Sequence, residues 1–283
     1  MNASRTSVYL DYNATAPLRP EAKDALLRAL ESPANPSSVH AAGRAARDVV
    51  ERARAEVAAL VGVPAGSITF VSGGTEGNAL AIESAKVAGV ERIILSAIEH
   101  DAVTETAKAS GLPVEVLPVD NYGVADLGWL AQALEKPGKA LVCLMLANNE
   151  IGVIQPVDKA SALVRAHDGW LHVDAVQAAG KIAIDFSGLG ADTMALSAHK
   201  LGGPQGVGAL VAGTRATVTR RLSIYPYVLS YGLDDPKVSY CLEGFDREPV
   251  ISSKEDLGQV SYTNLRGGTY TFRLNLEGES EEA

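Results

Sequence analysis

Hydrophobic and polar positions follow a helical period over several segments of the chain. Between residues 39 and 61, apolar side chains recur at three- and four-residue steps, which predicts an amphipathic helix. Ser37 and Ser38 are suitable caps for its start, and Gly62 is placed to end it. Further helix-like segments occupy residues 76–89, 126–134 and 159–167.

Short apolar runs rich in Val and Ile lie between the helix-like segments. They occupy residues 68–71, 92–98, 114–119, 140–147, 171–173, 193–196 and 207–211. Strands of a parallel sheet are buried on both faces, so they are apolar along their whole length. The alternation of such runs with helices therefore predicts an α/β domain with a mainly parallel sheet flanked by helices.

The pattern changes after Arg221. Three short segments alternate polar residues with Tyr, Phe and aliphatic residues, and Gly- and Asn-rich turns separate them. These segments occupy residues 238–242, 260–263 and 270–274. Such alternation is typical of antiparallel hairpins. We therefore predict one α/β domain over residues 1–222 and a β-rich tail of different character over residues 223–283.

Composition limits the class of protein. The 283 residues carry a formal net charge of −9, with 47% hydrophobic and 21% charged residues, which is ordinary for a globular protein. This charge gives no electrostatic footprint for nucleic acid or for an anionic membrane surface. The first residues lack the apolar core of a signal peptide, and the longest clean apolar run, 140–147, is only strand-sized. We expect a cytoplasmic protein with neither nucleic-acid nor membrane partners.

Polar side chains follow the predicted strands at the edge where open parallel sheets bind ligands. The strand at 68–71 leads into Gly73, Gly74 and Thr75 at the start of a helix, where free backbone N–H groups attract an anion. This turn is neither G-x-G-x-x-G nor a P-loop, which disfavours dinucleotides and nucleoside triphosphates. Taken alone, it is equally well explained as a plain connection between a strand and a helix.

Each of the other polar strand ends also has a structural explanation, as a core histidine, a helix cap or a solvated loop charge. These strand ends carry His100, Asn149, Asp174, Gln177, Ser197, His199 and Lys200. Their repeated occurrence at one expected edge of one sheet predicts a ligand site. A metal has little support, because His167 and His172 lack a ligand-like spacing with other donors.

Pyridoxal 5′-phosphate is the cofactor that uses this set most economically. It needs a lysine amine for a Schiff base, an acid for its pyridine nitrogen and an anion site for one phosphate. Lys200 would supply the amine, Asp174 the carboxylate, and Gly74 with Thr75 the phosphate cradle.

A series of motifs occurs in the order and spacing of one known family. The motifs are LDYNATAP (10–17), NPSSVH (35–40), SGGTE (72–76), NNEIG (148–152), HVDAVQ (172–177) and SAHK (197–200). Through them, residues 8–215 resemble the cysteine desulfurases, which belong to the class-V aminotransferase group of fold-type-I pyridoxal-phosphate enzymes. The resemblance implies the large cofactor domain of that fold. It also implies conversion of L-cysteine to L-alanine and enzyme-bound sulfur for iron–sulfur cluster or thio-cofactor synthesis.

The resemblance implies a role for each matching residue. Lys200 would form the Schiff base and move the Cα proton, and Asp174 would pair with the pyridine nitrogen. Gln177 would bond the ring hydroxyl with Asn149 close by, and His100 would stack on the ring and share in catalysis. The phosphate would be held by Gly74, Thr75, Ser197 and His199. The resemblance further implies a homodimer and a protein that accepts the sulfur.

The C-terminal part departs from the family. The Ser/Gly/Cys loop with the nucleophilic cysteine is absent, and so is the Gly-rich segment with the arginine that binds the substrate carboxylate. Cys143 lies in a predicted buried strand and Cys241 in a strand-like run, so we nominate neither as the nucleophile. We expect a truncated enzyme without the family's C-terminal small domain, with a weakened dimer or weakened cofactor binding.

The tail contains KVSY (237–240), LEGFD (242–246), VSYTNL (260–265) and GTYTFR (268–273). With these motifs, residues 237–274 resemble the tyrosine-rich β-sandwich module of hybrid two-component sensors, and a generic hairpin cluster is the alternative. Two other functions stay open for the whole chain. One is a fragment or fusion that binds pyridoxal phosphate but is inactive and acts as an interaction protein. The other is a selenocysteine lyase or another class-V lyase.

Overall fold

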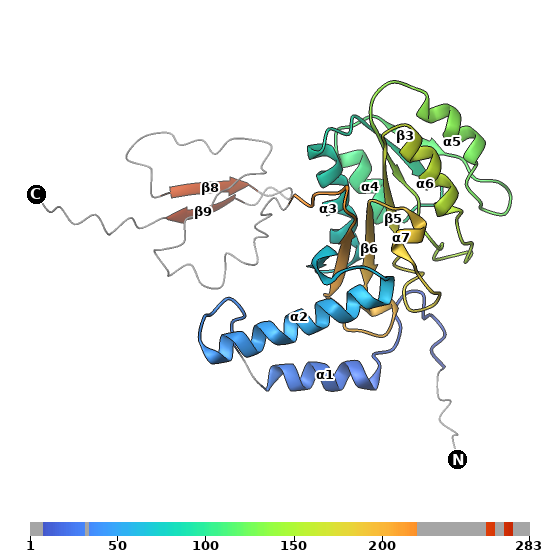
Figure 1. Ribbon diagram of the computed structural model, residues 1–283. Helices are drawn as coiled ribbons and strands as arrows, with labels where there is room; N and C mark the ends of the chain where they lie inside the picture. Colours follow the sequence, from blue (N-terminus) through green and yellow to red (C-terminus); the bar gives the residue numbers. More distant parts are fainter. Residues whose placement is uncertain (1–7, 32–33, 220–258, 264–268, 274–283) are drawn as a thin grey trace, which may run out of the picture. The chain divides into compact units, whose positions relative to one another are not determined.

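The computed structural model describes residues 8–31, 34–219, 259–263 and 269–273, the last two as backbone. The chain divides into two compact units, Met1–Thr219 and Arg220–Ala283, and each is described by itself. Figure 1 labels their helices and several of their strands.

The first unit alternates helices and strands along most of its length. Its helices are α1 (Pro20–Leu30), α2 (Ala41–Val61), α3 (Gly74–Val87), α4 (Asp101–Ala109), α5 (Leu127–Leu134), α6 (Val157–Ala166) and α7 (Phe186–Leu189), with 3-10 turns η1 (Ala65–Ser67) and η2 (Ala198–Lys200). Its strands are β1 (Ile68–Val71), β2 (Arg92–Ser96), β3 (Val114–Leu117), β4 (Ala140–Cys143), β5 (Trp170–Asp174), β6 (Thr193–Ser197) and β7 (Gly208–Ala212).

These strands form one seven-stranded sheet in the order β1-β7-β6-β5-β4-β2-β3. Every pair from β6 to β3 is parallel, whereas β7 runs antiparallel to both β6 and β1. Parallel neighbours need a long crossover, usually a helix, whereas the connection from β6 to β7 is short and contains only η2. The fold class predicted from the sequence, a mainly parallel sheet flanked by helices, is confirmed.

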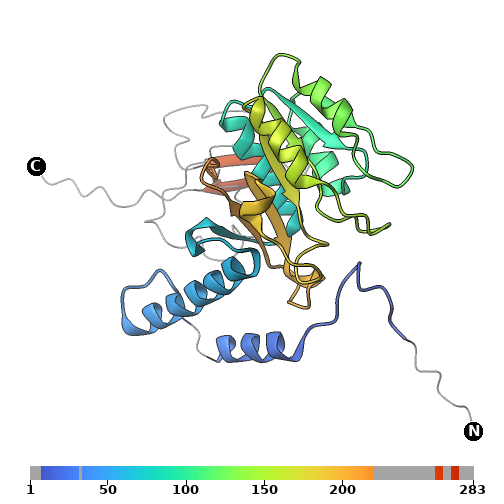
Figure 2. The ribbon, with the colours of Figure 1, turned by 45° about the vertical axis from the view of Figure 1, so that its right-hand side comes forward.

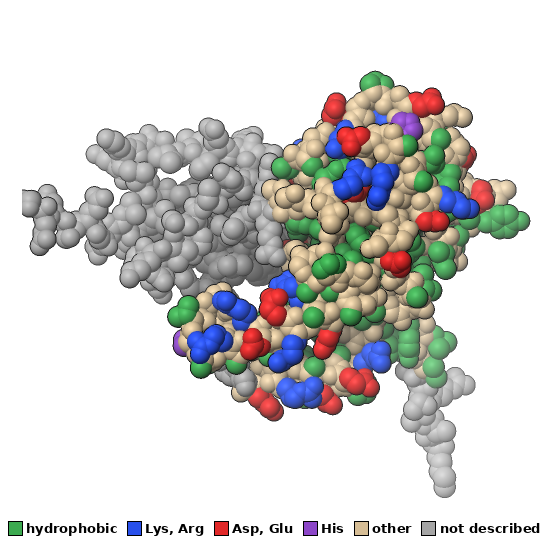
Figure 3. All heavy atoms as spheres, viewed as in Figure 1, with side chains coloured by type: hydrophobic (Ala, Val, Ile, Leu, Met, Phe, Trp, Pro, Cys, Tyr) green, Lys and Arg blue, Asp and Glu red, His purple; other side chains and the backbone are tan. Residues whose placement is uncertain are grey.

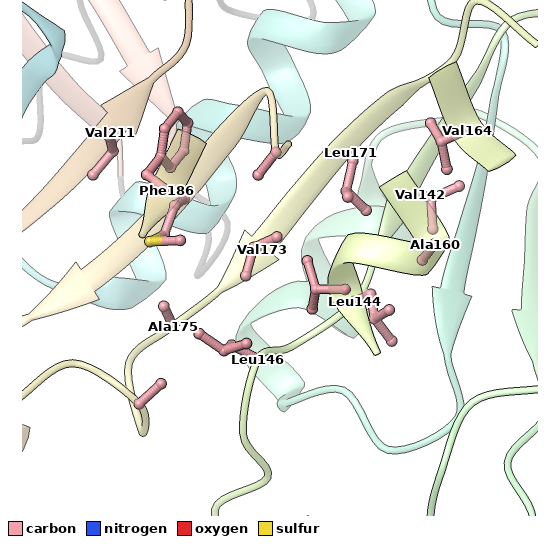
Figure 4. Packing of buried hydrophobic residues seen from close by; sticks show 14 of the residues in the cluster. Val142, Leu144, Leu146, Ala160, Val164, Leu171, Val173, Ala175, Phe186 and Val211 are labelled. Atoms are coloured by element: carbon pink, nitrogen blue, oxygen red, sulfur yellow. The ribbon is translucent and has the colours of Figure 1, made fainter. Parts of the chain in front are cut away.

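The two faces of the sheet are covered by different helices. On β2, Ile94 packs into a core that includes α5 and α6, whereas Ile93 and Leu95 pack into a second core with α3 and α4. Figure 4 shows part of the first core, where Val142 and Leu171 lie with residues of α6. Helices on both faces therefore explain why most residues of the central strands are apolar.

The boundaries of four predicted elements, one helix and three strands, need correction. Helix α2 begins at Ala41 and is capped by His40, whose ring Nδ1 accepts a hydrogen bond from the Gly43 N–H, rather than by Ser37 or Ser38. It ends at Val61 as predicted.

The strand predicted over residues 140–147 ends at Cys143. Leu144 and Leu146 still donate backbone hydrogen bonds to His172 and Asp174 and are buried, which explains the apolar pattern. The N–H of Met145 instead donates to the Glu99 carboxylate, so the regular ladder stops. The strands predicted over 92–98 and 114–119 likewise end two residues earlier, at Ser96 and Leu117.

Helices α1 and α2 lie next to each other in both ribbon views (Figures 1 and 2). Helix α1 buries none of its side chains, although Leu26, Leu27 and Leu30 are on it. Acidic and basic side chains are interspersed over these helices on the face seen in Figure 3.

Among the helices that the structure describes, none combines the length and the apolar character needed to cross a bilayer.

The second unit contains the strands β8 (Gln259–Thr263) and β9 (Thr269–Arg273), which pair antiparallel with Tyr262 opposite Tyr270. The segments predicted at 260–263 and 270–274 thus pair as a hairpin over their described residues, 260–263 and 270–273. The strand predicted at 238–242, with Cys241, lies outside the described residues. The resemblance of residues 237–274 to a sensor module therefore stays a prediction.

Candidate functional site

A cavity of about 220 Å³ lies at the carboxyl ends of β4, β5 and β6. Its lining includes every site residue predicted from the sequence, namely Gly74, Thr75, His100, Asn149, Asp174, Gln177, Ser197, His199 and Lys200. The strands β2, β4, β5 and β6 are neighbours in the sheet and parallel, so the residues that follow them meet at one edge. The predicted convergence is confirmed, whereas the role of each residue stays a prediction.

The start of α3 forms one wall of the cavity. Backbone N–H groups in the first turn of a helix have no partner within the helix and carry the positive end of its dipole. A Cβ added at Gly74 would lie 2.6 Å from Cγ2 of Val176 and 3.7 Å from Cβ of Ser197. The helix start, Thr75 and Ser197 therefore line one part of the cavity, which would suit an anion, and a side chain at position 74 would press on Val176.

Asp174 provides a buried carboxylate at the end of the central strand β5, with 5% of the residue exposed. Its Oδ1 accepts a hydrogen bond of 2.9 Å from the Val176 N–H, and its Oδ2 accepts one of 2.8 Å from Asn78 Nδ2. Burial raises the pKa of Asp174, while the two hydrogen bonds and the charges of His100 and Lys200 oppose that rise. Such a carboxylate is suited to pair with a protonated nitrogen that enters the cavity.

Lys200 ends the turn η2 directly after β6. Its Nζ donates hydrogen bonds to the backbone oxygens of Asn13, at 2.7 Å, and Ala14, at 2.9 Å. Burial lowers the pKa of Lys200, and the nearby carboxylates of Asp11 and Asp174 raise it in part. A lysine whose pKa is lowered supplies more neutral amine for attack on a carbonyl group.

Asn13, near the N-terminus, forms hydrogen bonds with both predicted amide residues, Gln177 and Asn149. Gln177 Nε2 donates to the Asn13 backbone oxygen at 2.8 Å, and Asn13 Nδ2 donates to the Asn149 oxygen at 3.1 Å. A second amine, Lys181 Nζ, donates to Asn13 Oδ1 and to Gln177 Oε1. Asn13 therefore connects its own segment to the loops that carry Asn149 and Gln177. These partners lie 136 and 164 positions later in the sequence.

The two histidines of the site have defined ring contacts. His100 caps α4, and its Nδ1 accepts a hydrogen bond of 3.0 Å from the Ala102 N–H, so its neutral ring carries the proton on Nε2. His199 Nδ1 lies 3.2 Å from the Thr15 hydroxyl. Burial and the charge of Lys200 lower the pKa of His199. Within the described part of the chain, no three His, Cys, Asp or Glu side chains gather as metal ligands would.

Asn78 lines the cavity, and Glu99 lies next to it through its hydrogen bond to Met145; neither residue was expected from the sequence to have a role. Asn78 lies one helical turn after Gly74 in α3, so helical periodicity was a usable signal for it. Glu99 accepts a hydrogen bond of 2.6 Å from the Met145 N–H, and its Oε2 is buried with no hydrogen-bond partner among the described residues. Burial, and then the charge of Asp174, raise the pKa of Glu99 to about 8. No local pattern distinguished Glu99 from a solvated strand end.

Residues 8–222 match the family model described as aminotransferase class-V. A protein of Dictyoglomus turgidum named cysteine desulfurase IscS is 42% identical over 213 residues, which are 73% of this chain and 54% of that protein. The chain thus spans about half the length of the curated relatives it matches.

Solved structures have the same fold. The X-ray structure of a NifS-like protein from Rickettsia africae superposes with a TM-score of 0.71 and 34% identity, covering 76% of this chain and 60% of that chain. The structure of SspA in complex with cysteine superposes with a TM-score of 0.70 and 30% identity, covering 76% of this chain and 64% of that chain.

Proposed function

Since this chain belongs to the class-V aminotransferase family, we propose that it binds pyridoxal 5′-phosphate and acts on L-cysteine as a desulfurase-type enzyme. The products would be L-alanine and sulfur. One observation carries the proposal: Lys200, Asp174 and the start of α3 line the same cavity. Relatives named cysteine desulfurase, and a similar structure that holds cysteine, support the choice of substrate.

The residues present fit this cofactor. The buried Asp174 carboxylate would pair with the protonated pyridine nitrogen, and the anion pocket at Gly74 and Thr75 would hold the phosphate. Ser197 and His199 would add donors from the opposite wall, and Gln177 and Asn149 would lie beside the ring substituents. When bound, the cofactor supplies an electron sink for a carbanion at the substrate Cα.

The protein's own groups would handle the protons. Lys200 Nζ, with its lowered pKa, would take the proton from the substrate Cα and later return one to the alanine product. His100 would cover the ring face and present its Nε2–H to the bound substrate, because its Nδ1 is occupied by the Ala102 N–H. Met145 and Ala147 line the same cavity and would limit the access of water.

Cys143 does not serve as the sulfur acceptor in this proposal. It is fully buried in β4, and burial raises its pKa well above the ordinary value. Because the thiolate is the nucleophile, such a thiol is inert. Cys241 lies outside the described residues.

Because Cys143 is inert, we keep a second candidate function: a protein that binds the cofactor but does not release sulfur, and acts through interactions with other molecules.

Further parts of the proposal rest on the sequence alone. They are a homodimer, a protein that accepts the sulfur, and a cytoplasmic location. Sedimentation velocity of the full chain with and without pyridoxal phosphate tests the dimer, and a monomer under both conditions contradicts it.

The test of the function uses the full chain purified with pyridoxal phosphate. We expect a visible absorption band of bound cofactor in the wild type and its loss in Lys200→Ala. Lys181→Ala is the matched control, since its amine bonds Asn13 and Gln177 nearby, and we expect this variant to keep the band. A wild-type spectrum that does not depend on Lys200 contradicts the cofactor assignment.

The second stage adds L-cysteine and a reductant and measures alanine and sulfide. Release of both supports the desulfurase, and an intact band without either product supports the binding-only function. Faster release of selenide from L-selenocysteine would instead identify a selenocysteine lyase. Cys143→Ala should release products at the wild-type rate.

A further inference from the structure

Two polar residues of β5 face the helices α3 and α4. Strand side chains alternate, so Trp170, His172 and Asp174 share one face, while Leu171 and Val173 point toward α6. Trp170 packs in the core formed with α3 and α4. His172 is fully buried on that face, two residues before the carboxylate at the cavity. A buried imidazole so close to the site requires hydrogen-bond partners.

Asn78 of α3 joins the two residues. Its Nδ2 donates to Asp174 Oδ2 at 2.8 Å, and its Oδ1 lies 2.9 Å from His172 Nε2. On the far side of the ring, His172 Nδ1 lies 2.9 Å from the Thr193 hydroxyl of β6. All four side chains are buried, so a continuous chain of hydrogen bonds runs from Thr193 to the cavity.

Only one direction of hydrogen bonds is compatible with an ionised Asp174. The carboxylate accepts, so Asn78 must present its NH₂ group to Asp174 and its oxygen to His172. His172 Nε2 must then carry the proton, and Nδ1 accepts from the hydroxyl of Thr193. A neutral ring satisfies this arrangement, and burial lowers the pKa of His172 to about 4, which keeps it neutral at pH 7.

We propose that His172 is a positioning residue for the cofactor site, because its Nε2–H orients Asn78 and Asn78 in turn orients the Asp174 carboxylate. The inference rests on the proposed function, in which Asp174 receives the pyridine nitrogen of pyridoxal phosphate. Without the His172 donor, the Asn78 amide can turn its oxygen toward the carboxylate. Asp174 then loses a charge-assisted hydrogen bond in a buried place and takes up a proton more readily.

Two variants of His172 distinguish positioning from simple packing. His172→Leu fills a similar volume with an apolar side chain and removes the Nε2–H donor. His172→Gln instead keeps an N–H donor on a side chain of similar reach. Cys143→Ala is the matched control. Cys143 lies opposite His172 in the β4–β5 register and is equally buried, but it is outside the hydrogen-bond chain.

The experiment titrates each purified full chain with pyridoxal phosphate and records its dissociation constant and absorption spectrum as a function of pH. We expect His172→Leu to weaken cofactor binding about tenfold or more and to change the pH dependence of the spectrum. His172→Gln and Cys143→Ala should stay within about threefold of the wild type. Equal affinity and an equal spectrum for the wild type and His172→Leu overturn the inference.

A second measurement needs no cofactor and covers the case in which His172→Leu does not fold. Nitrogen NMR of the cofactor-free wild type should show His172 neutral, with its proton on Nε2, at pH 7. A proton on Nδ1, or a charged ring, overturns the inference by itself. Failure of the proposed function gives a different result: the wild type binds no pyridoxal phosphate, although His172 still carries its proton on Nε2. In that case there is no cofactor site for His172 to position, and the inference is wrong for that reason.

Discussion

At the residue scale, the site depends on a few buried polar groups whose protonation the fold controls. Asp174 and Glu99 are both carboxyl groups next to the cavity, but they differ in their hydrogen bonds. Asp174 receives two donors, whereas Glu99 receives one, from Met145. Burial raises the pKa of both groups, to about 8 for Glu99, while the two donors to Asp174 oppose the rise there. Burial thus acts on both pKa values in the same direction, and the hydrogen bonds distinguish the two groups.

The raised pKa of Glu99 makes stability depend on pH. Its pKa is about 8 in the folded chain against an ordinary 4.5, so between these values the folded state holds a proton that the unfolded chain releases. The free energy of unfolding should then fall as pH rises, by at most about 1.4 kcal/mol per unit. Glu99→Gln should remove this slope, as measured by urea unfolding between pH 5 and 8.

Glu105→Gln is the control for this measurement, because Glu105 is an exposed partner of Lys108. It should keep the wild-type slope. The interpretation is wrong if Glu99→Gln and the wild type lose stability in parallel over this range.

Gly74 gives a second prediction at the residue scale. A Cβ at this position would lie 2.6 Å from Val176 Cγ2, so Gly74→Ala must move the start of α3 or the loop after Asp174. We expect affinity for pyridoxal phosphate to fall about tenfold or more. Val176→Ala in the same chain removes the clashing methyl group and should restore most of the affinity. A double variant no better than Gly74→Ala would contradict the steric account.

At the element scale, the helices and strands are set by local signals that the structure mostly confirms. Helix α2 ends where Gly62 adopts a φ of 71°, a left-handed conformation that other residues adopt at a cost. Its start was assigned incorrectly, because a histidine took the capping role that Ser37 and Ser38 are suited to. Ring nitrogens cap helices less often than hydroxyls, so the sequence signal favoured serine.

The end of α2 can be tested directly. Gly62→Ala should lower the free energy of unfolding by about 1 kcal/mol, since alanine in the left-handed region is strained. Gly66→Ala is the matched control, because Gly66 has open space and no positive φ, and it should be near neutral. Chemical denaturation measures both, and equal effects would contradict the role of φ.

At the scale of the whole molecule, the described residues that line the cavity all belong to the first unit. Its lining runs from Gly74 to Lys200, and Asn13 adds backbone contacts. A chain of residues 1–219 should therefore bind pyridoxal phosphate within about threefold of the full chain. Titration by visible absorption measures this. Loss of binding in a fragment with native circular dichroism would show that residues 220–283 contribute to the site.

Much of the fold and site was predictable because its signals are local. Apolar runs gave the strands of the mainly parallel sheet, and motifs at their ends gave the residues that line the cavity. The antiparallel β7 was not predicted, because its run at 207–211 reads like the others and only the short connection after Lys200 sets its direction. Glu99 was also not assigned, because its burial depends on the chain around Met145.

The sequence by itself determined where the strands and four of the helices form and which side chains stand at the strand ends, since both follow from periodicity and from the residue types at each turn. Only the tertiary structure decided which of those side chains contact each other. Asn78 and Asp174 are 96 positions apart, and Asn78 and His172 are 94 apart. Such contacts depend on the order of strands in the sheet and on the helix that crosses them, and no local pattern encodes either. The hydrogen-bond chain behind the cavity is therefore a property of the packed fold.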